Sequence, residues 1–289
     1  MTPAAFDPKI DDAARRRFDE DGYHMIPGLL SEDEARAWRL EINRVFGLPE
    51  HELTNADIGP ETRALADGVT KTPQFWPLIF NERLVATVRA LLGDDVRYTQ
   101  HSDIHINLGA GKFHRDSAWR DFGVGPDWDE HEAPYRVVRV AIYLSDYTNS
   151  GSSLLILPGT HRHESRLNRL EFRFWNELRT RWRNHFSTNS MPQWALTAPR
   201  KLIRHKPGDC VVFDQRLVHA GGAVRGTHPK YAVYLSYGRD NQHAHNHHDY
   251  YLERPTYLRE LPDALAGRLE DENLLLSTRT RDTGRSAAN

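Results

Sequence analysis

The sequence predicts a mainly β protein with flanking helices, and three observations support this fold class. Short, β-branched apolar runs recur through residues 96–237 and are separated by Gly and Pro turns, as in sandwiches and barrels. Helical patterns precede them in residues 11–93. A chain of 289 residues without a linker-like stretch fits one domain, residues 1–289, with elaborations around a single core.

The N-terminal helical layer, residues 11–93, is predicted from caps and periodicity. Asp11–Asp21 is expected to be a charged helix, and Tyr23–Ile26 a short strand. Ser31-Glu32-Asp33-Glu34 is a capping box that opens a second helix. The apolar residues on one face of that helix are Trp38, Ile42, Val45 and Phe46. Ile79–Leu92 is predicted to be another helix, closed by the glycine that follows it.

The β core is predicted to span residues 96–237. Its strands are expected at Val96–Leu108, Arg136–Ser145, Ser153–Leu157, Lys201–His205, Cys210–Phe213 and Tyr231–Tyr237. Short strands between Gly and Pro turns, packed by helices, favour a double-stranded β-helix, which is a jelly-roll (cupin-like) relative. We expect a helical insertion at 164–194 and a C-terminal extension at 238–289.

The insertion at 164–194 mixes aromatic and aliphatic residues with arginines. We expect a helix that covers one face of the barrel and leaves its arginines in solvent. A lid over the site and a subunit interface are the alternatives, since enzymes often gate their sites with such segments. The sequence leaves these three open, and it leaves open whether the protein is a monomer or a homodimer.

Composition and charge exclude several classes of protein. The formal net charge is −2 and the basic residues are scattered, so we expect no nucleic-acid partner. The single cysteine, Cys210, lies within an expected strand, so it should be buried and a disulfide framework is excluded. No apolar run reaches the length of a membrane span, and residues 1–7 lack the apolar core of a signal peptide. We therefore expect a cytoplasmic protein that does not interact with membranes.

The pattern His-x-Asp occurs three times, at His101-Ser102-Asp103, His114-Arg115-Asp116 and His247-His248-Asp249. On a strand, residues two apart point to the same face, so such a pair can hold one metal ion. The first copy lies in the middle of an expected strand, which favours a wall position. The third lies in the polar run 243–248, which we expect to be a solvated loop. Only the middle copy follows a glycine-rich turn, residues 108–111, and precedes an aromatic residue, Trp119, that could wall a pocket.

A third ligand is predicted from the segment Lys206–Gly222. Pro207-Gly208-Asp209 is a turn signal, because Pro presets φ and Gly supplies a positive φ. A short β-branched run follows and is predicted to be a buried strand. His219 stands at its far end beside two glycines that let a ligand approach closely. Two histidines and one carboxylate would form the face that ferrous oxygenases use, with open positions for a co-substrate and O2.

Four segments in one order carry a family resemblance: Phe18–Leu30, Phe113–Asp116, Asn149–Arg162 and Lys206–Gly222. Together they resemble the phytanoyl-CoA dioxygenase-like branch of the Fe(II)/2-oxoglutarate oxygenases. By this resemblance His114, Asp116 and His219 would be the catalytic iron ligands, with 2-oxoglutarate and O2 as co-substrates. Family halogenases replace the carboxylate with a small residue, so Asp116 implies hydroxylation, desaturation or ring formation rather than halogenation.

The anchor for 2-oxoglutarate departs from the family's pattern. In the family a basic residue, usually arginine, follows the distal histidine and pairs with the distal carboxylate of 2-oxoglutarate. Lys230 lies nearest to that position, and Arg225 lies earlier, in an expected turn. We favour Lys230, with Arg225 as the fallback, although a lysine is less directional than the two-pronged guanidinium. The alternative is that both face solvent and another residue anchors the acid. Relatives often carry a hydroxyl residue where this chain has Gly221.

The substrate site is predicted less sharply. The segment Ser117–Asp129 follows the ligand pair and is expected to overhang the site, with Trp119, Arg120 and Arg115 as candidate substrate-binding residues. The residues that would make these surroundings polar and partly basic are Arg115, Arg120, Arg139, His101 and His105. Arg139 alternates with valines on its strand, so the alternative for it is a solvent-facing position.

Two function classes follow from these residues. The first is an Fe(II)/2-oxoglutarate-dependent hydroxylase of a small polar or anionic metabolite, such as a sugar acid, an amino acid derivative or a phosphonate, or of a natural-product intermediate. The second is a non-catalytic or differently metallated β-helix protein that binds a small ligand. The lysine in place of the usual arginine anchor is the feature of the sequence that favours the second class.

Overall fold

The computed structural model describes residues 10–59, 61–108, 111, 113–170 and 199–277. Most of the predicted insertion at 164–194 lies outside these residues, and only its short helix α8 (Arg166–Leu170) is described. Its role as a covering helix, lid or interface stays a prediction. The centre of the glycine-rich turn, residues 109–110, also lies outside the described residues.

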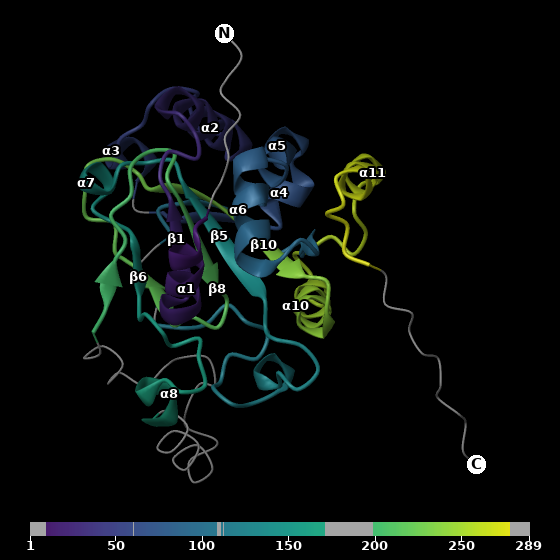
Figure 1. The fold of residues 1–289 in the computed structure, drawn as a ribbon. Helices are drawn as coiled ribbons and strands as arrows, with labels where there is room; N and C mark the ends of the chain where they lie inside the picture. Colours follow the sequence, from purple (N-terminus) through teal and green to yellow (C-terminus); the bar gives the residue numbers. More distant parts are fainter. Residues whose placement is uncertain (1–9, 60, 109–110, 112, 171–198, 278–289) are drawn as a thin grey trace.

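Two antiparallel β-sheets form the core of the fold (Figure 1). The seven-stranded sheet has the order β1-β8-β5-β10-β4-β2, and β3 pairs with β10 off this path. Its strands are β1 (Tyr23–Ile26), β2 (Arg63–Ala66), β3 (Val96–Tyr98), β4 (Asp103–Ile106), β5 (Val137–Tyr143), β8 (Cys210–Asp214) and β10 (Tyr231–Arg239). The three-stranded sheet has the order β7-β6-β9, with β7 (Lys201–Leu202), β6 (Leu154–Ile156) and β9 (His219–Gly221). The predicted β core is therefore present, with strands somewhat shifted or shorter than expected.

Side-chain alternation gives the large sheet two different faces. On β5, Val138, Val140 and Ile142 belong to a large core shared with the helices, whereas Ala141 and Tyr143 pack with residues of the small sheet. The same alternation holds along β8 and β10. The helices therefore cover one face and the small sheet covers the other. Polar side chains on the second face point into the space between the two sheets.

Helices surround the sheets as the sequence predicts for the N-terminal layer (Figure 1). The helices are α1 (Asp12–Asp21), α2 (Glu32–Val45), α3 (Asn55–Ile58), α4 (Gly68–Lys71), α5 (Trp76–Ile79), α6 (Glu82–Leu92), α7 (Tyr147–Ser150), α10 (Gln242–Leu252) and α11 (Asp263–Asp271), with 3-10 turns η1 (Pro73–Phe75) and η2 (Pro126–Trp128). The capping box predicted at Ser31 and Glu34 is present at the start of α2. Asp11 caps α1 by accepting a hydrogen bond from the backbone N–H of Ala14 at 2.6 Å.

Two elements differ from the bounds that the sequence predicts. The strand expected at Val96–Leu108 is split into β3 and β4, because Gln100 adopts a left-handed φ of +55°. The amide of Gln100 donates hydrogen bonds to the backbone carbonyl of Leu258 (2.6 Å) and to Asp67 (3.2 Å), which compensates this conformation. The helix expected at Ile79–Leu92 is present as α6 but begins later, at Glu82, because Asn81 caps it by accepting from the backbone N–H of Leu84 at 3.0 Å. Ile79 is instead the last residue of α5.

The histidine run 243–248 is a helix, so the loop prediction for it was wrong. Asn241 caps α10, and its side chain accepts from the backbone N–H groups of His243 and Ala244. Nε2 of His243 donates a hydrogen bond to the carbonyl of Ala133 at 3.0 Å, and His247 is fully buried. Hydrogen bonding of the imidazoles allows a polar sequence to form a packed helix.

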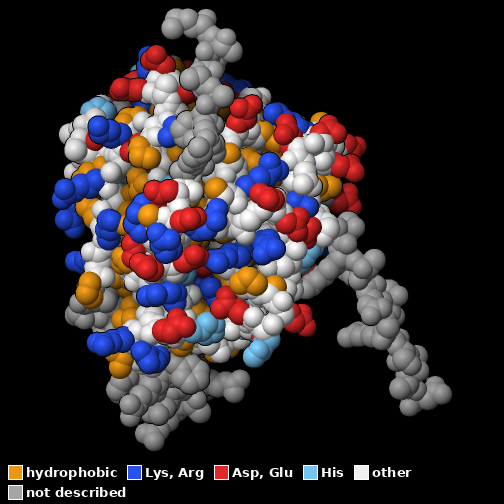
Figure 2. Space-filling view, in the orientation of Figure 1, with side chains coloured by type: hydrophobic (Ala, Val, Ile, Leu, Met, Phe, Trp, Pro, Cys, Tyr) orange, Lys and Arg blue, Asp and Glu red, His pale blue; other side chains and the backbone are white. Residues whose placement is uncertain are grey.

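Three further features of the surface and the core bear on the expectations drawn from composition. On the face shown in Figure 2, acidic and basic side chains are intermixed rather than gathered by sign. Cys210 is buried and free. Among the described residues, every helix is too short or too polar to cross a membrane.

The turn at Pro207-Gly208-Asp209 provides a stability test. Gly208 has a φ of +87°, and an added Cβ would lie 2.1 Å from the carbonyl oxygen of Leu30. Gly208→Ala should therefore lower the free energy of unfolding by about 1–3 kcal/mol. Gly267, inside α11, has open space around it. Gly267→Ala should raise the free energy of unfolding by about 0.5–1 kcal/mol. Urea unfolding of both variants checks this, and equal stabilities would contradict it.

Candidate metal and co-substrate site

A backbone bridge brings the predicted ligands together. His114 and His219 exchange two hydrogen bonds, each 2.9 Å from amide nitrogen to carbonyl oxygen, as an isolated antiparallel bridge. The amide of Asp116 donates to the carbonyl of Gln215 at 2.8 Å. His219 starts β9, whereas His114 lies in a bridge and not in the regular strand that the sequence suggested. Residues far apart in the chain are thereby aligned side by side.

The three side chains converge on one point. The carboxylate of Asp116 lies 3.4 Å from Nε2 of His114 and 3.5 Å from Nε2 of His219. One donor atom from each residue lies within 4.8 Å of the others, and among the described residues no other group of three His, Cys, Asp or Glu side chains does so. Metal–ligand bonds of about 2.0–2.2 Å require donors about 3 Å apart when they meet at right angles. The set therefore fits the two-His-one-carboxylate face of a ferrous site.

The protonation states suit metal binding. Nδ1 of His219 donates to the carbonyl of Leu217 at 2.9 Å, which leaves Nε2 with its lone pair toward Asp116. Burial lowers the pKa of His219 to about 4, so the ring is neutral at pH 7. Burial opposes ionisation of Asp116, but the neighbouring His219, His114 and Arg139 hold the pKa of this carboxyl well below its usual value. A neutral imidazole and an ionised carboxylate are the forms that bind a metal ion.

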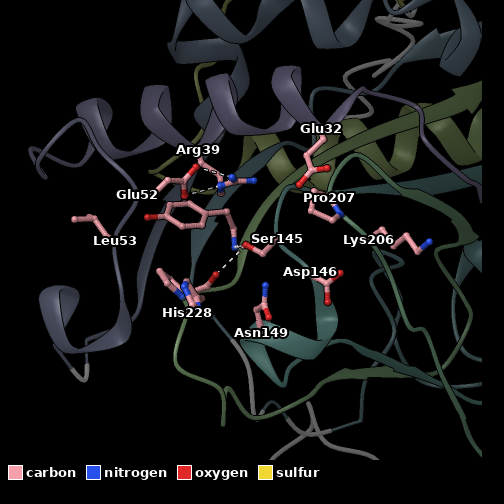
Figure 3. Close-up of a pocket in the computed structure, with 12 residues that line it drawn as sticks. Glu32, Arg39, Glu52, Leu53, Ser145, Asp146, Asn149, Lys206, Pro207 and His228 are labelled. Carbon is pink, nitrogen blue, oxygen red and sulfur yellow. Dashed lines mark hydrogen bonds and ion pairs between the residues drawn. The ribbon is translucent and has the colours of Figure 1, made fainter.

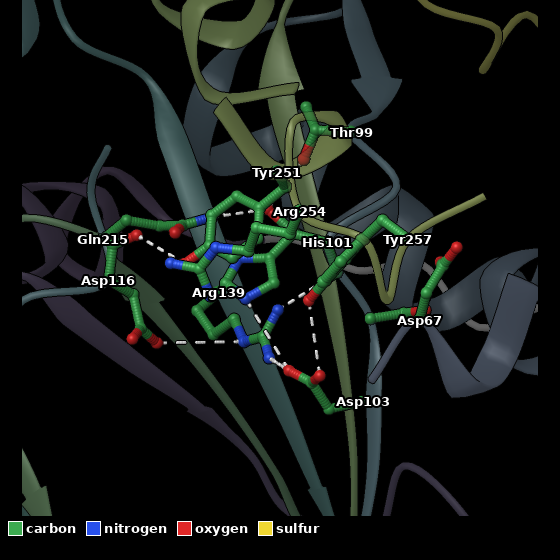
Figure 4. A network of polar contacts seen from close by, with 12 residues as sticks. Asp67, Thr99, His101, Asp103, Asp116, Arg139, Gln215, Tyr251, Arg254 and Tyr257 are labelled. Carbon is green, nitrogen blue, oxygen red and sulfur yellow. Dashed lines mark hydrogen bonds and ion pairs between the residues drawn. The ribbon is translucent and has the colours of Figure 1, made fainter. Parts of the chain in front are cut away.

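Arg139 lies beside Asp116 and contacts its carboxylate (Figure 4). Its side chain is 3% exposed and forms an ion pair with Asp103, and its Nε lies 3.8 Å from Oδ2 of Asp116. Burial opposes the charge, but the two carboxylates keep the pKa of Arg139 above its usual value. The solvent-facing alternative for Arg139 was wrong. The signal for this was a single arginine in the run Val137–Tyr143, whose other members are all apolar.

The first His-x-Asp copy forms a wall, as expected. The ring of His101 stacks on Tyr251 with centroids 3.5 Å apart, and its Nδ1 lies 3.1 Å from Nε2 of His247. Burial lowers the pKa of His101 well below its usual value, so it is neutral. The hydroxyl of Tyr251 donates to the backbone carbonyl of Asp116 at 3.3 Å. The wall therefore braces the segment that carries His114 and Asp116.

A cavity of about 400 Å³ lies between the two sheets beside the triad. The large sheet and the turn before β10 line it with Asp103, His105, Arg139, Lys230 and Tyr234, and the small sheet lines it with Leu154, His219 and Gly221. The segment between β4 and β5 adds His114, Asp116 and Arg120. The C-terminal extension adds Tyr251, Arg254, Thr256 and Tyr257. This volume is at the lower end of the range for small-molecule sites. The contribution of the C-terminal extension was not predicted, because its sequence has no motif that points to the cavity.

Lys230 is a buried basic residue in the wall of this cavity. It is 2% exposed, and its Nζ donates to the backbone carbonyl of Leu108. Burial lowers the pKa of Lys230 to about 8, and among the described residues no carboxylate pairs with it. Arg225 is exposed and does not line the cavity. A buried, unpaired ammonium group is costly unless an anion binds to it.

Of the candidate substrate-binding residues, the structure brings only Arg120 to the cavity. Arg115 is 1% exposed and its guanidinium donates to the carbonyl of Arg216 and to Asn168 at 3.0 and 2.9 Å, so it holds the loop together. Trp119 is 48% exposed and packs beside Gly125 rather than in the cavity wall. Its position directly after the ligand pair gave no information about side-chain direction.

A separate cavity of about 320 Å³ lies between α2 and the turn before β10 (Figure 3). Arg39 in this cavity is paired with Glu52 at 2.5 Å and also donates to the carbonyl of Leu144. Tyr231 at its edge donates to Asn43 at 2.6 Å. Arg39, Glu52 and Tyr231 therefore have partners within the protein.

Comparison with known proteins agrees with this geometry. A family model described as phytanoyl-CoA dioxygenase (PhyH) matches residues 18–232. The chain belongs to this family. PhyH proteins are Fe(II)/2-oxoglutarate-dependent dioxygenases, so the resemblance predicted from four sequence segments is confirmed, and the donor set described above fits the family's cofactors, Fe(II) and 2-oxoglutarate.

Curated relatives of this PhyH protein include ectoine dioxygenases. The protein from Streptomyces avermitilis is 26% identical over 162 residues, which is 53% of this chain and 52% of the relative. The chain thus spans about half the length of that relative. The ectoine dioxygenase from Sphingopyxis alaskensis is 22% identical and matches 88% of this chain and 84% of its own length.

Solved structures confirm the fold class of the PhyH protein. HygX from Streptomyces hygroscopicus, with nickel and 2-oxoglutarate bound, superposes with a TM-score of 0.58 at 22% identity, over 80% of this chain and 88% of that one. The epimerase SnoN from nogalamycin biosynthesis, in complex with Fe3+ and alpha ketoglutarate, superposes with a TM-score of 0.55 at 18% identity. The match covers 80% of this chain and 85% of SnoN. The predicted double-stranded β-helix is therefore confirmed.

The metal ligands can be tested against a matched decoy. Asp116→Ala should abolish the binding of one Ni(II) ion per chain, because it removes the carboxylate of the triad. Asp249→Ala changes the aspartate of another His-x-Asp copy and should leave Ni(II) binding intact, since Asp249 lies on α10 outside the cavity. Calorimetric titration of both variants measures this. Retained binding in Asp116→Ala would contradict the assignment.

Proposed function

We propose that this protein is an Fe(II)/2-oxoglutarate-dependent dioxygenase that hydroxylates a small polar or anionic molecule. The observation that carries the proposal is the position of Lys230, a buried ammonium group without a carboxylate partner among the described residues, in the same cavity as the His114, Asp116 and His219 triad. This arrangement offers a dicarboxylate one cationic end and one metal end.

Each residue has a role in this proposal. His114, Asp116 and His219 would hold Fe(II), which when bound supplies the oxidative chemistry with O2 and 2-oxoglutarate. Lys230 would bind the distal carboxylate of 2-oxoglutarate. Arg139 would keep Asp116 ionised and fix its orientation through the Asp103 ion pair. The two sheets would shield the reacting atoms from water.

Several observations support the small polar substrate. The cavity must hold both 2-oxoglutarate and the substrate within about 400 Å³. Arg120, His105 and Arg254 add polar groups to its wall. Relatives named ectoine dioxygenase agree with a substrate of small size. We propose a small-molecule substrate and no nucleic-acid partner, since the charges on the face in Figure 2 are intermixed.

Turnover without substrate tests the reaction class. Purified protein with Fe(II), ascorbate and 2-oxoglutarate should form succinate slowly, and His219→Ala should reduce this to the level without protein because one metal ligand is lost. Succinate is quantified by chromatography. The alternative, a non-catalytic or differently metallated binding protein, predicts that no succinate forms in any condition. If the protein also fails to bind 2-oxoglutarate, the oxygenase proposal is ruled out.

The pH dependence of 2-oxoglutarate binding tests the anchor. Lys230 has a lowered pKa of about 8 in the free protein, so its charged form is present below pH 8 and is lost as the pH rises above it. The dissociation constant of 2-oxoglutarate for the Ni(II)-loaded protein should therefore rise roughly tenfold from pH 7 to pH 9. Lys230→Arg keeps its charge and should flatten this rise.

The same titration separates the two candidate anchors. Lys230→Ala should weaken 2-oxoglutarate binding by roughly ten- to hundredfold, as expected for the loss of a hydrogen bond between charged groups. Arg225→Ala should change it little, because Arg225 is exposed outside the cavity. The reverse order of effects would make Arg225 the anchor.

A further inference from the structure

We propose that Arg120 and Arg254 form the binding site for an anionic group of the substrate, a carboxylate or a phosphate, at the end of the cavity closed by the C-terminal extension. This inference rests on the proposed function and names the substrate class of the same site. It follows from the charges that line the cavity and from which of them have partners.

The cavity wall carries more cations than carboxylates. Its charged residues are Asp103, Asp116, Arg120, Arg139, Lys230 and Arg254. His101 and His105 do not add to this charge, because burial lowers the pKa of His105 to about 4 and that of His101 well below its usual value. Two carboxylates therefore face four cationic side chains.

Most of these charged side chains have a partner or a role in the proposed function. Asp103 is paired with Arg139, and Asp116 is a metal ligand in the proposed function. Lys230 is assigned to 2-oxoglutarate. Arg120 and Arg254 remain, and among the described residues neither forms an ion pair with a carboxylate. A partly buried guanidinium without a counter-charge favours binding of an anion.

The guanidinium of Arg120 is incompletely hydrogen-bonded within the described residues. Its Nε is buried and has no hydrogen-bond partner among the described residues. The backbone carbonyl of Arg120 accepts from Arg115 at 2.9 Å, which fixes the segment that carries it. A guanidinium can bind a carboxylate or a phosphate with two parallel hydrogen bonds.

Arg254 is held in place by aromatic rings. Its guanidinium carbon lies 4.4 Å from the ring centre of Tyr251 and 5.0 Å from that of Tyr250, and Nη2 donates to the hydroxyl of Tyr250 at 3.1 Å. These contacts position the side chain without neutralising it. A pre-positioned cation loses little conformational entropy when it binds an anion.

Tyr251 connects this arginine to the metal ligands (Figure 4). One side of Tyr251 contacts Arg254, and its hydroxyl donates to the backbone carbonyl of Asp116 at 3.3 Å. Tyr257 lies beside it, with ring centres 5.3 Å apart. An anion held by the arginines would therefore leave the rest of a small substrate along this aromatic wall, within reach of the triad.

The position of these residues in the chain fits a role in substrate choice. The match to the PhyH family ends at residue 232, whereas Tyr251, Arg254, Thr256 and Tyr257 lie beyond it. The metal ligands and Lys230 lie within the matched region. The part of the wall that would bind the substrate anion is thus partly supplied by a segment outside the family match.

Binding of matched small probes tests the inference. Benzoate and phenyl phosphate carry an anion on an aromatic ring, and benzamide is their neutral counterpart. Protein loaded with Ni(II) and 2-oxoglutarate should bind one of the anions at least about tenfold more tightly than benzamide at low ionic strength, measured by ligand-observed NMR titration. The tighter anion identifies a carboxylate or a phosphate as the natural group.

Variants locate the effect. Arg120→Gln and Arg254→Gln should each remove most of the anion preference, and Arg254→Lys should keep part of it because charge remains without the planar fork. Arg44→Gln, on the exposed face of α2 and paired with Glu41, is the control and should keep it fully. Thermal melting of each variant verifies folding, and a variant that fails to fold is replaced by its lysine substitution.

The outcomes separate this inference from the proposed function. Failure of the wild-type protein to bind Ni(II) and 2-oxoglutarate would contradict the proposed function. If these bind, the inference is overturned when benzamide binds as tightly as the anions, when no probe binds at millimolar concentration, or when both glutamine variants keep the full preference.

Discussion

The backbone bridge between His114 and His219 is the contact on which the site depends. It joins the segment before β5 to the start of β9, so that one large and one small sheet enclose a common space. The bridge fixes both imidazoles, and the amide of Asp116 is held by Gln215 next to it. Side-chain ligands that are preorganised by backbone hydrogen bonds need no rearrangement to meet a metal ion.

Charge compensation is the second constraint, and it extends outward from the triad. The charge of Arg139 helps to keep Asp116 ionised, and Arg139 is in turn paired with Asp103. The histidines of the wall are neutral, so they contribute packing and hydrogen bonds rather than charge. The cationic side chains that have no carboxylate partner among the described residues, such as Lys230, favour the binding of anions in the cavity.

Much of the site could be predicted from the sequence, because its residues lie next to strong local signals. Gly208 has the positive φ that its turn requires, and the candidate ligand His219 follows the buried strand after that turn. The histidines of α10 could not be predicted, since their burial depends on partners such as Ala133 and His101 that are distant in the chain. The interruption of the strand at Gln100 could not be predicted either, because apolar and polar residues alternate regularly around it. The contacts that stabilise this interruption are with Asp67 and Leu258, which are distant in the chain.

A crystal structure of the protein grown without oxygen in the presence of Fe(II) and 2-oxoglutarate would test the central claim most directly. The account predicts one iron ion bound by His114, Asp116 and His219, with the distal carboxylate of 2-oxoglutarate on Nζ of Lys230. Iron bound elsewhere, or a 2-oxoglutarate carboxylate paired with another cation of the cavity such as Arg254, would contradict it.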